Sequence, residues 1–437
     1  MYFLNRMKIQ KSGGYFMFKG KGHKLTIYLL LLVLVVSLTA CSSSTSSDKP
    51  EEQEQDKSQT DTAAEKPEVK EPIKIGIVTS KTGPLEAYGN QMLRGFELGL
   101  DYATNGTREI DGRKIEVYIE DSETNPEKGV EKATKLLEET KVDVLVGSAS
   151  SGVALAILPL AEEYERVMVV EPAVADSITG SEWNRYIFRT GRNSSQDAVA
   201  GAVAISKPGT KIAIIAPDYA FGRDGAAAFK TAAEKLGAEI VLEEYPPINA
   251  TDFTATVQKV IDVKPDYLYV IWAGANSPWK TIMDMKVTEK GTKISTGAPD
   301  IAALKTMNAF VGMEGFTVYY HTLPDNKVND WLVEEHQKRF NEVPDLFTPG
   351  GMSNAIAIVE GIKKAGTTDA DALIKAMEGM SFETPKGTMT FRAEDHQALQ
   401  ALYAITLEQV DGYDYPVPTL IREMKPEELI PPILNNK

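Results

Sequence analysis

The fold is decided by Ile73-Lys-Ile-Gly-Ile-Val-Thr-Ser-Lys-Thr-Gly-Pro-Leu-Glu-Ala-Tyr-Gly89, where a short apolar run leads into an amphipathic one. Residues 73–78 are rich in isoleucine and valine and predict a strand. Residues 89–102 predict a helix, because Met92, Phe96 and Leu100 recur every four residues on one face. Gly95 and Gly99 lie in the same helix. Because glycine has no side chain, these two residues would let another segment pack closely against the helix, at some cost in helix propensity.

The same order of strand and helix continues along the chain. A first series predicts strands at 114–120, 142–146 and 167–170, and helices that start at Asn125-Pro126 and span 152–165. A second series predicts strands at 211–216, 239–243, 267–271 and 293–296, and helices at 222–236, 252–263 and 278–285. Short apolar strands that alternate with helices are typical of parallel sheets covered on both faces. The predicted fold class is therefore α/β, with two Rossmann-like lobes.

The C-terminal part does not repeat this pattern. It predicts helices at 329–340, 351–364 and 369–377, followed by a hairpin around Pro385-Lys386-Gly387. These elements are too few for a third lobe of the same kind. We expect them to complete the first two lobes.

The N-terminus has the pattern of a lipoprotein leader. Basic residues precede an apolar run of 14 residues, 25–38, which is shorter than the roughly 20 residues of a spanning helix. The run ends in Leu38-Thr-Ala-Cys41, and small residues before a cysteine are what lipoprotein processing requires. We predict a signal peptide at 1–40 and lipidation of Cys41. An uncleaved anchor with an incidental cysteine is the alternative, and translation could start at Met1, Met7 or Met17.

Residues 41–71 predict a disordered linker tied to the membrane by its lipid. Hydroxyl residues are followed by a stretch of Glu, Gln, Asp and Lys with almost nothing apolar, and such a composition cannot bury enough surface to fold. Two acyl chains hold a protein stably at a membrane. The predicted location is the extracellular face of the cell membrane of a Gram-positive bacterium, where a receptor without an anchor would diffuse away.

Charge and composition exclude several kinds of partner. The first 40 residues hold six of the 47 basic side chains and none of the 62 acidic ones, so their removal changes the formal net charge from −15 to −21. A surface this acidic argues against nucleic acid. The single cysteine is Cys41, and His321, His336 and His396 are far apart in sequence. We therefore predict no metal site and no cofactor.

Five segments together resemble the leucine/isoleucine/valine-binding family of type I periplasmic binding proteins. They are the opening stretch 75–89, Asp121-Ser-Glu-Thr-Asn-Pro126, Val146-Gly-Ser-Ala-Ser-Ser-Gly152, Phe188-Arg-Thr-Gly191 and Ile212-Ala-Ile-Ile-Ala-Pro-Asp-Tyr-Ala-Phe-Gly222. Each segment alone is a weak signal. Their order and spacing over residues 73 to about 400 are specific.

This resemblance implies a domain organisation and a function. The chain would cross between the lobes three times, near 191, 322 and 400, giving lobe 1 at 72–191 and 323–400 and lobe 2 at 192–322 and 401–437. The family's members are receptors of ABC importers. The implied protein is a monomeric receptor that binds a branched-chain or similar amino acid between its lobes and delivers it to permease and ATPase subunits.

The resemblance also implies ligand-binding residues. Ser150 and Ser151 follow a strand and open a helix, so their hydroxyls and the free N–H groups there suit a carboxylate. Helix capping by serine is the alternative interpretation. Tyr88 matches the aromatic residue that covers the ligand in the family, and a surface or hinge aromatic is the alternative interpretation. The other candidates are loop residues of both lobes: Ala173, Ala175, Tyr219, Phe221 and Trp272.

Asp300 and the loop at 171–175 bear on the chemical class of the ligand. Asp300 resembles the family's acidic partner of a ligand ammonium, but it could also cap the helix that follows. The loop Glu171-Pro-Ala-Val-Ala175 lacks the hydroxyl residue that amino-acid receptors carry three positions after the proline. Glu171 either faces the ligand or is held behind it by backbone donors. An amide, a urea-like compound or a small carboxylic acid therefore remains an alternative ligand.

Two incomplete motifs argue against a phosphate-binding loop and against an enzyme. Gly147 and Gly152 are spaced as in a phosphate loop, but Val153-Ala154 replaces its Lys-Ser/Thr. The nucleophile motif Gly-x-Ser-x-Gly is also incomplete at 147–151, so we predict no enzyme activity. A sensor that reports its ligand to a membrane partner is the remaining alternative to an importer receptor.

Overall fold

The computed structural model describes residues 70–274 and 276–435. The predicted signal peptide, the lipidated Cys41 and the linker as far as residue 69 lie outside the described residues. Within the described ranges, no helix combines the length and the apolar character needed to cross a bilayer.

The first lobe is built on a six-stranded sheet in the order β2-β3-β1-β4-β5-β6. All its neighbouring strands are parallel except β2, which runs antiparallel to β3. The strands are β1 (Ile73–Thr79), β2 (Glu109–Ile110), β3 (Arg113–Asp121), β4 (Val144–Gly147), β5 (Val167–Val170) and β6 (Ile187–Arg189). β1 lies at the centre, which is why the opening stretch of the sequence is so strongly apolar.

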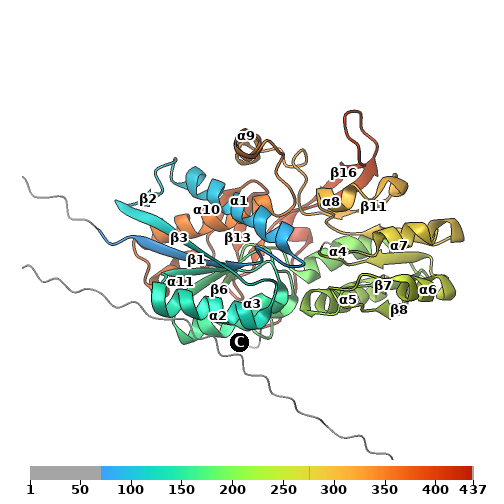
Figure 1. Cartoon of the computed structure of the whole chain (residues 1–437), viewed down its shortest axis with the longest axis horizontal. Helices are drawn as coiled ribbons and strands as arrows, with labels where there is room; N and C mark the ends of the chain where they lie inside the picture. Colours follow the sequence, from blue (N-terminus) through green and yellow to red (C-terminus); the bar gives the residue numbers. More distant parts are fainter. Residues whose placement is uncertain (1–69, 275, 436–437) are drawn as a thin grey trace, which may run out of the picture. The chain divides into compact units, whose positions relative to one another are not determined.

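Helices cover both faces of this sheet. α1 and α10 lie side by side on one face, and α2 and α3 lie on the other (Figure 1). The helices of this lobe are α1 (Glu86–Ala103), α2 (Pro126–Lys135) with a π-helical turn (Leu136–Thr140), α3 (Ser151–Glu163), α9 (Lys327–Phe340), α10 (Thr348–Ala365) and α11 (Ala370–Met377). A 3-10 turn (Asp176–Ile178) and a small antiparallel sheet of β12 (Ser381–Thr384), β13 (Gly387–Phe391) and β14 (Ala398–Leu399) complete the lobe.

The second lobe has a four-stranded parallel sheet in the order β10-β9-β7-β8. Its strands are β7 (Lys211–Ile215), β8 (Glu239–Glu244), β9 (Tyr267–Val270) and β10 (Lys293–Thr296). Its helices are α4 (Ser194–Ile205), α5 (Ala220–Lys235), α6 (Thr254–Val263), α7 (Trp279–Asp284), α8 (Ile301–Leu304) and the 3-10 turns Thr288–Lys290, Asn308–Phe310 and Pro426–Glu428. An antiparallel sheet of β11 (Glu314–Thr317), β15 (Leu402–Glu408) and β16 (Val417–Met424) adjoins it.

The hydrophobic cores explain how the C-terminal part is used. One core combines buried residues from 73–188 with others from 328–398. Two further cores combine residues from 198–323 with others from 402–429. One of these two cores also contains Leu346 and Phe347. The C-terminal elements thus contribute to the cores of both lobes. The lobe limits near 191, 322 and 400 stay a prediction.

Local sequence signals correspond closely to element ends. The Asn125 side chain accepts a hydrogen bond from the Lys128 N–H at 2.8 Å, and Pro126 opens α2, as the Asn-Pro pair predicts. The α1 helix begins at Glu86, three residues earlier than the pattern suggested. Several elements were not predicted. They are α4, whose alanine-rich sequence has no clear apolar face, and the strands β2, β6, β11, β14, β15 and β16.

Close contact between α1 and α10 depends on glycines from both helices. A Cβ atom on Gly95 would lie 1.8 Å from the Thr348 carbonyl oxygen, and one on Gly99 would lie 2.6 Å from the Met352 carbonyl oxygen. From the other side, a Cβ atom on Gly351 would lie 2.0 Å from the Met92 carbonyl oxygen. The two backbones therefore touch directly, as Gly95 and Gly99 suggested.

The substitution Gly95→Ala should lower the free energy of unfolding by at least about 2 kcal/mol, because α1 and α10 would have to separate. Urea unfolding measured by circular dichroism checks this. Gly152→Ala is a matched control within a helix, since its Cβ would meet its nearest neighbours at 3.7 Å. It should change stability by no more than about 1 kcal/mol. Equal effects of the two substitutions would contradict the close contact.

Candidate ligand-binding site

A cavity of about 60 Å³ lies where the carboxyl ends of both parallel sheets meet. Loops of the first lobe contribute residues that follow β4, β5 and β6, and loops of the second lobe contribute residues that follow β7, β9 and β10. Open α/β sheets bind ligands at the carboxyl ends of their strands. This cavity is therefore the candidate ligand-binding site.

Six of the nine predicted ligand-binding residues line this cavity: Tyr88, Ser151, Ala173, Tyr219, Phe221 and Trp272. The other three do not. Ser150 caps α3, with its hydroxyl accepting the Val153 N–H at 3.4 Å. Ala175 is fully buried behind the wall. Asp300 caps α8, accepting the Ala303 N–H at 2.7 Å, and lines a second cavity that shares Tyr88 and Trp272 with the first. Both Ser150 and Asp300 therefore act as helix caps, and their role in ligand binding stays a prediction.

Ser151 joins two loops of the first lobe. Its hydroxyl oxygen accepts the N–H groups of Val174 at 3.3 Å and Ala175 at 3.2 Å. In addition, the Ala173 N–H donates to the Ser148 carbonyl at 3.1 Å. A serine hydroxyl has two acceptor sites and one proton to donate. With both acceptor sites occupied, the Ser151 proton is left to donate to an acceptor such as a ligand carboxylate.

Aromatic rings make up much of the remaining wall. Tyr88 packs against Phe347 with 4.6 Å between ring centroids, and Phe229 stacks on Tyr269 at 3.9 Å. Burial, followed by the charge of Asp300, raises the pKa of Tyr88. Burial alone raises the pKa of Tyr219. Both phenols therefore stay neutral and can donate a hydrogen bond to a ligand.

The cavity wall also contains an ion pair that the sequence did not reveal. The Arg192 Nε donates to Asp197 Oδ1 at 3.0 Å, and both residues line the cavity. Their side chains are 7% and 15% exposed. Burial raises the pKa of Asp197, and its contact with Arg192 opposes this shift. Arg192 and Asp197 are five residues apart at the start of α4. This spacing matches neither a helix nor a strand period, so the sequence pattern did not predict the contact.

The comparisons with known proteins agree with this geometry. A family profile described as periplasmic binding protein matches residues 72–412. The chain belongs to this family. A solved structure of an ABC-type branched-chain amino acid transporter from Rhodopseudomonas palustris is 50% identical, with a TM-score of 0.73, and the match covers 84% of this chain and 100% of that chain.

Two further relatives differ in what they bind. A solute-binding protein of an ABC transporter from Rhodopseudomonas palustris, solved in complex with 3,4-dihydroxybenzoic acid, is 28% identical with a TM-score of 0.72 over 81% of this chain and 97% of that chain. The leucine-, isoleucine-, valine-, threonine- and alanine-binding protein of Pseudomonas aeruginosa is 25% identical over 73% of this chain and 85% of its own length.

These findings confirm the predicted type I periplasmic binding fold. The protein is the solute-binding component of an ABC transporter. Because its relatives are binding receptors, the prediction that it is not an enzyme is also confirmed.

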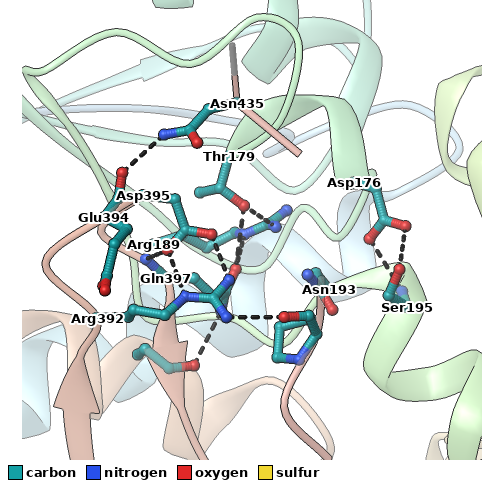
Figure 2. Close-up of polar contacts among 12 residues, drawn as sticks. Asp176, Thr179, Arg189, Asn193, Ser195, Arg392, Glu394, Asp395, Gln397 and Asn435 are labelled. Atoms are coloured by element: carbon teal, nitrogen blue, oxygen red, sulfur yellow. Dashed lines mark hydrogen bonds and ion pairs between the residues drawn. The ribbon is translucent and has the colours of Figure 1, made fainter. Parts of the chain in front are cut away.

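In this periplasmic binding protein, a fully buried arginine at the end of β6 ties neighbouring chain segments together. The Arg189 guanidinium donates to Gln397 Oε1 and to the Ala175 carbonyl, each at 2.6 Å, and to the Thr179 hydroxyl (Figure 2). The Gln397 amide in turn donates to the Gly191 carbonyl at 2.7 Å. The loop after β5, the segment that leaves β6 and the segment that returns before β14 are thus held together.

Two further polar contacts lie on either side of Arg189 in Figure 2. The Ser195 hydroxyl donates to Asp176 at 2.6 Å, which fixes the start of α4 to the loop after β5. Arg392 Nε donates to Asp395 Oδ1 at 2.9 Å beside the returning segment. The hinge region is therefore organised by buried polar groups rather than by apolar packing alone.

Glu171 lies behind the cavity wall and not within it. The Thr190 hydroxyl donates to its carboxylate at 3.3 Å, so its hydrogen bond comes from a side chain rather than from backbone donors. Burial raises the pKa of Glu171, and the charges of Lys386 and Arg192 oppose the shift. Burial also lowers the pKa of Lys386 to about 8, while its amine donates to Gln400 Oε1 at 2.7 Å.

Asp345 links the two lobes beside Tyr88. It belongs to the loop before α10 and accepts hydrogen bonds from Gln91 Nε2 at 2.9 Å and from the Ile301 N–H at 3.1 Å. Nearby, the Gly274 N–H donates to the Tyr88 hydroxyl at 3.4 Å. Burial, with a smaller contribution from the charge of Asp300, raises the pKa of Asp345 to about 7 from its ordinary value of 3.8.

The raised pKa of Asp345 predicts a pH-dependent stability. Between its unfolded value of 3.8 and about 7, the folded protein holds more protons at this group than the unfolded chain. The free energy of unfolding contributed by Asp345 therefore falls as pH rises through that window. Denaturant titrations of the wild type and of Asp345→Asn at pH 4 to 8 measure it. The wild type minus variant difference should decrease with pH and then level off; a constant difference contradicts the assignment.

Proposed function

We propose that this protein captures an amino acid or a related small carboxylate between its two lobes and delivers it to the permease and ATPase of an ABC importer. The observation that carries the proposal is the cavity at the carboxyl ends of both sheets, because loops of both lobes line it. A ligand held from both sides favours closure of the lobes about their hinge. The six predicted residues that line the cavity are the proposed ligand contacts.

An amino-acid ligand is supported by the Ser151 hydroxyl, by the apolar wall and by the ligands of the Pseudomonas aeruginosa relative. An ammonium group would need an acceptor in the wall. Asp300 caps α8 outside this wall, so it gives little support to a dedicated ammonium site. Among the described residues that line the cavity, the one carboxylate is that of Asp197.

An aromatic acid is the second candidate ligand. The rings of Tyr88, Phe347, Tyr269 and Phe229 offer stacking surfaces for a flat apolar body. The relative solved with 3,4-dihydroxybenzoic acid supports this class. Amino acids and aromatic acids both carry a carboxylate. They differ in the rest of the molecule, which is an aromatic ring in one class and a side chain with an ammonium group in the other.

A thermal-shift screen of the full chain, purified in detergent, should find its ligand among these two classes. A ligand at about 100 times its Kd adds about 2.7 kcal/mol to the stability of the folded state, which raises the melting temperature by a few degrees. The screen should contain the branched-chain amino acids, alanine, threonine, benzoate, 4-hydroxybenzoate and the amide of each acid, which lacks the carboxylate. If only the amides raised the melting temperature, the proposed ligand class would be wrong.

The proposed location is the outer face of the cell membrane, with the chain held by a lipid on Cys41. The support for this comes from the leader and from Leu38-Thr-Ala-Cys41, and the acidic, hydroxyl-rich segment at 42–69 would serve as the tether. A flexible tether of about 30 residues has a typical span of roughly 30 Å, enough for the receptor to reach a neighbouring permease.

The substitution Cys41→Ser should release the protein from the membrane, because no thiol remains to carry the lipid. Fractionation of a Gram-positive host, followed by immunoblotting, would measure the share in membranes and in the medium. Ser42→Ala is the control and should leave the protein with the membrane. A Cys41→Ser protein that stays with the membrane fraction would favour an uncleaved anchor.

A further inference from the structure

The ion pair of Arg192 and Asp197 in the cavity wall has features of a built recognition site. Arg192 precedes the capping residue Asn193, and Asp197 lies in the first turn of α4. The Asn193 side chain accepts the Gln196 N–H at 2.9 Å, and the Gln196 side chain accepts the Asn193 N–H at 3.0 Å. This reciprocal capping box fixes the backbone on both sides of the pair.

The segment that carries Arg192 is also fixed to the hinge. The amide nitrogens of Gln397 and Gln400 donate to the Gly191 carbonyl at 2.7 Å and to the Thr190 carbonyl at 3.0 Å. The Arg192 guanidinium lies 5.7 Å from the centroid of the Phe347 ring, which gives its face an aromatic neighbour. Arg192 is therefore held in position by both its backbone and its side chain.

The pair leaves part of its hydrogen-bonding capacity unused. Only Nε of Arg192 and Oδ1 of Asp197 take part in the contact between them. Across the described residues, the two Nη groups of Arg192 have no hydrogen-bond acceptor, and Oδ2 of Asp197 has no donor. Neither residue is among those with fully buried, unpartnered side-chain atoms, so the unpaired Nη groups are not sealed off from the cavity, where a ligand can supply the acceptor.

The charges behind the wall support a bound anion. Glu171 and Lys386 lie close enough to Arg192 to affect one another's pKa values, and they are of opposite sign. Together with Asp197 they leave the group close to neutral overall. A carboxylate that approaches the Nη groups therefore meets a fixed cation without a large excess of negative charge.

We infer that Arg192 is a specificity-determining residue, which binds the ligand carboxylate through its Nη groups, and that Asp197 is the positioning residue that orients it. This inference rests on the proposed function, since it concerns the same cavity. An arginine held in this way accepts a planar carboxylate in a two-pronged contact. A carboxamide offers one oxygen acceptor and a competing donor, so the site should reject the amide of a ligand that it binds as an acid.

The test compares acids with their amides on the full chain, purified in detergent. The probes are leucine with leucinamide and 4-hydroxybenzoate with 4-hydroxybenzamide, measured by isothermal titration calorimetry. The wild type should bind at least one acid, and more tightly than its amide. Arg192→Gln should weaken binding of that acid by roughly 10–100-fold and change binding of the amide by less than about 3-fold.

A matched control comes from a second arginine–aspartate pair of the same lobe. Arg223 Nη2 contacts Asp218 Oδ1 at 2.6 Å, also over five residues, but its side chain is 51% exposed and does not line the cavity. Arg223→Gln should leave both affinities unchanged. Asp197→Asn keeps the guanidinium but not its orientation, so it should weaken acid binding less than Arg192→Gln and retain a preference for the acid over the amide.

A folding defect is excluded by a further variant. Arg192→Gln alone leaves a largely buried carboxylate without its partner, whereas Arg192→Gln/Asp197→Asn removes both charges. The double variant should melt close to the wild type and show the same loss of acid binding. If the wild type bound neither acid, the proposed function and this inference would both fall. If it bound an acid and Arg192→Gln kept the same ratio of acid to amide affinity, the inference alone would be overturned.

Discussion

The buried charge of Arg189 is the interaction on which the arrangement of the binding site depends. Its guanidinium is fully buried, and burial lowers its pKa to about 10, so it stays protonated at neutral pH. A buried cation is tolerated only when its donors are satisfied. Here the acceptors come from two segments: the loop after β5, through the Ala175 carbonyl and the Thr179 hydroxyl, and Gln397, which is distant in sequence (Figure 2). Satisfying one charge thus fixes the end of β6, the loop after β5 and the segment before β14 to one another.

The cavity wall is an extension of this network. The loop after β5 is held from one side by Arg189 and from the other by the Ser151 hydroxyl. The crossing segment that follows β6 carries Arg192 to the cavity. Near this wall, the second lobe contacts the first through two hydrogen bonds, one from Gly274 to Tyr88 and one from Ile301 to Asp345. The proposed ligand contacts and the contacts between the lobes therefore use adjacent residues, and in our proposal this couples binding to closure.

Much of the fold could be predicted from sequence because it rests on local, periodic signals. The strands of both parallel sheets, the Asn125 cap and the glycines at 95 and 99 all act within a few residues of where they stand. Part of the site could not be predicted, because it depends on contacts without any period. Gln397 lies 208 residues from Arg189, and the position of Asp300 outside the wall of the candidate site depends on how α8 packs.

The most direct test of the account is a crystal structure of the protein with the tightest-binding acid of the two candidate classes. The account predicts the ligand between the two lobes, with its carboxylate within hydrogen-bonding distance of the Arg192 Nη groups and its apolar body against the aromatic rings of Tyr88 and Tyr219. A ligand bound outside this cavity, or one whose carboxylate faced away from Arg192, would contradict it.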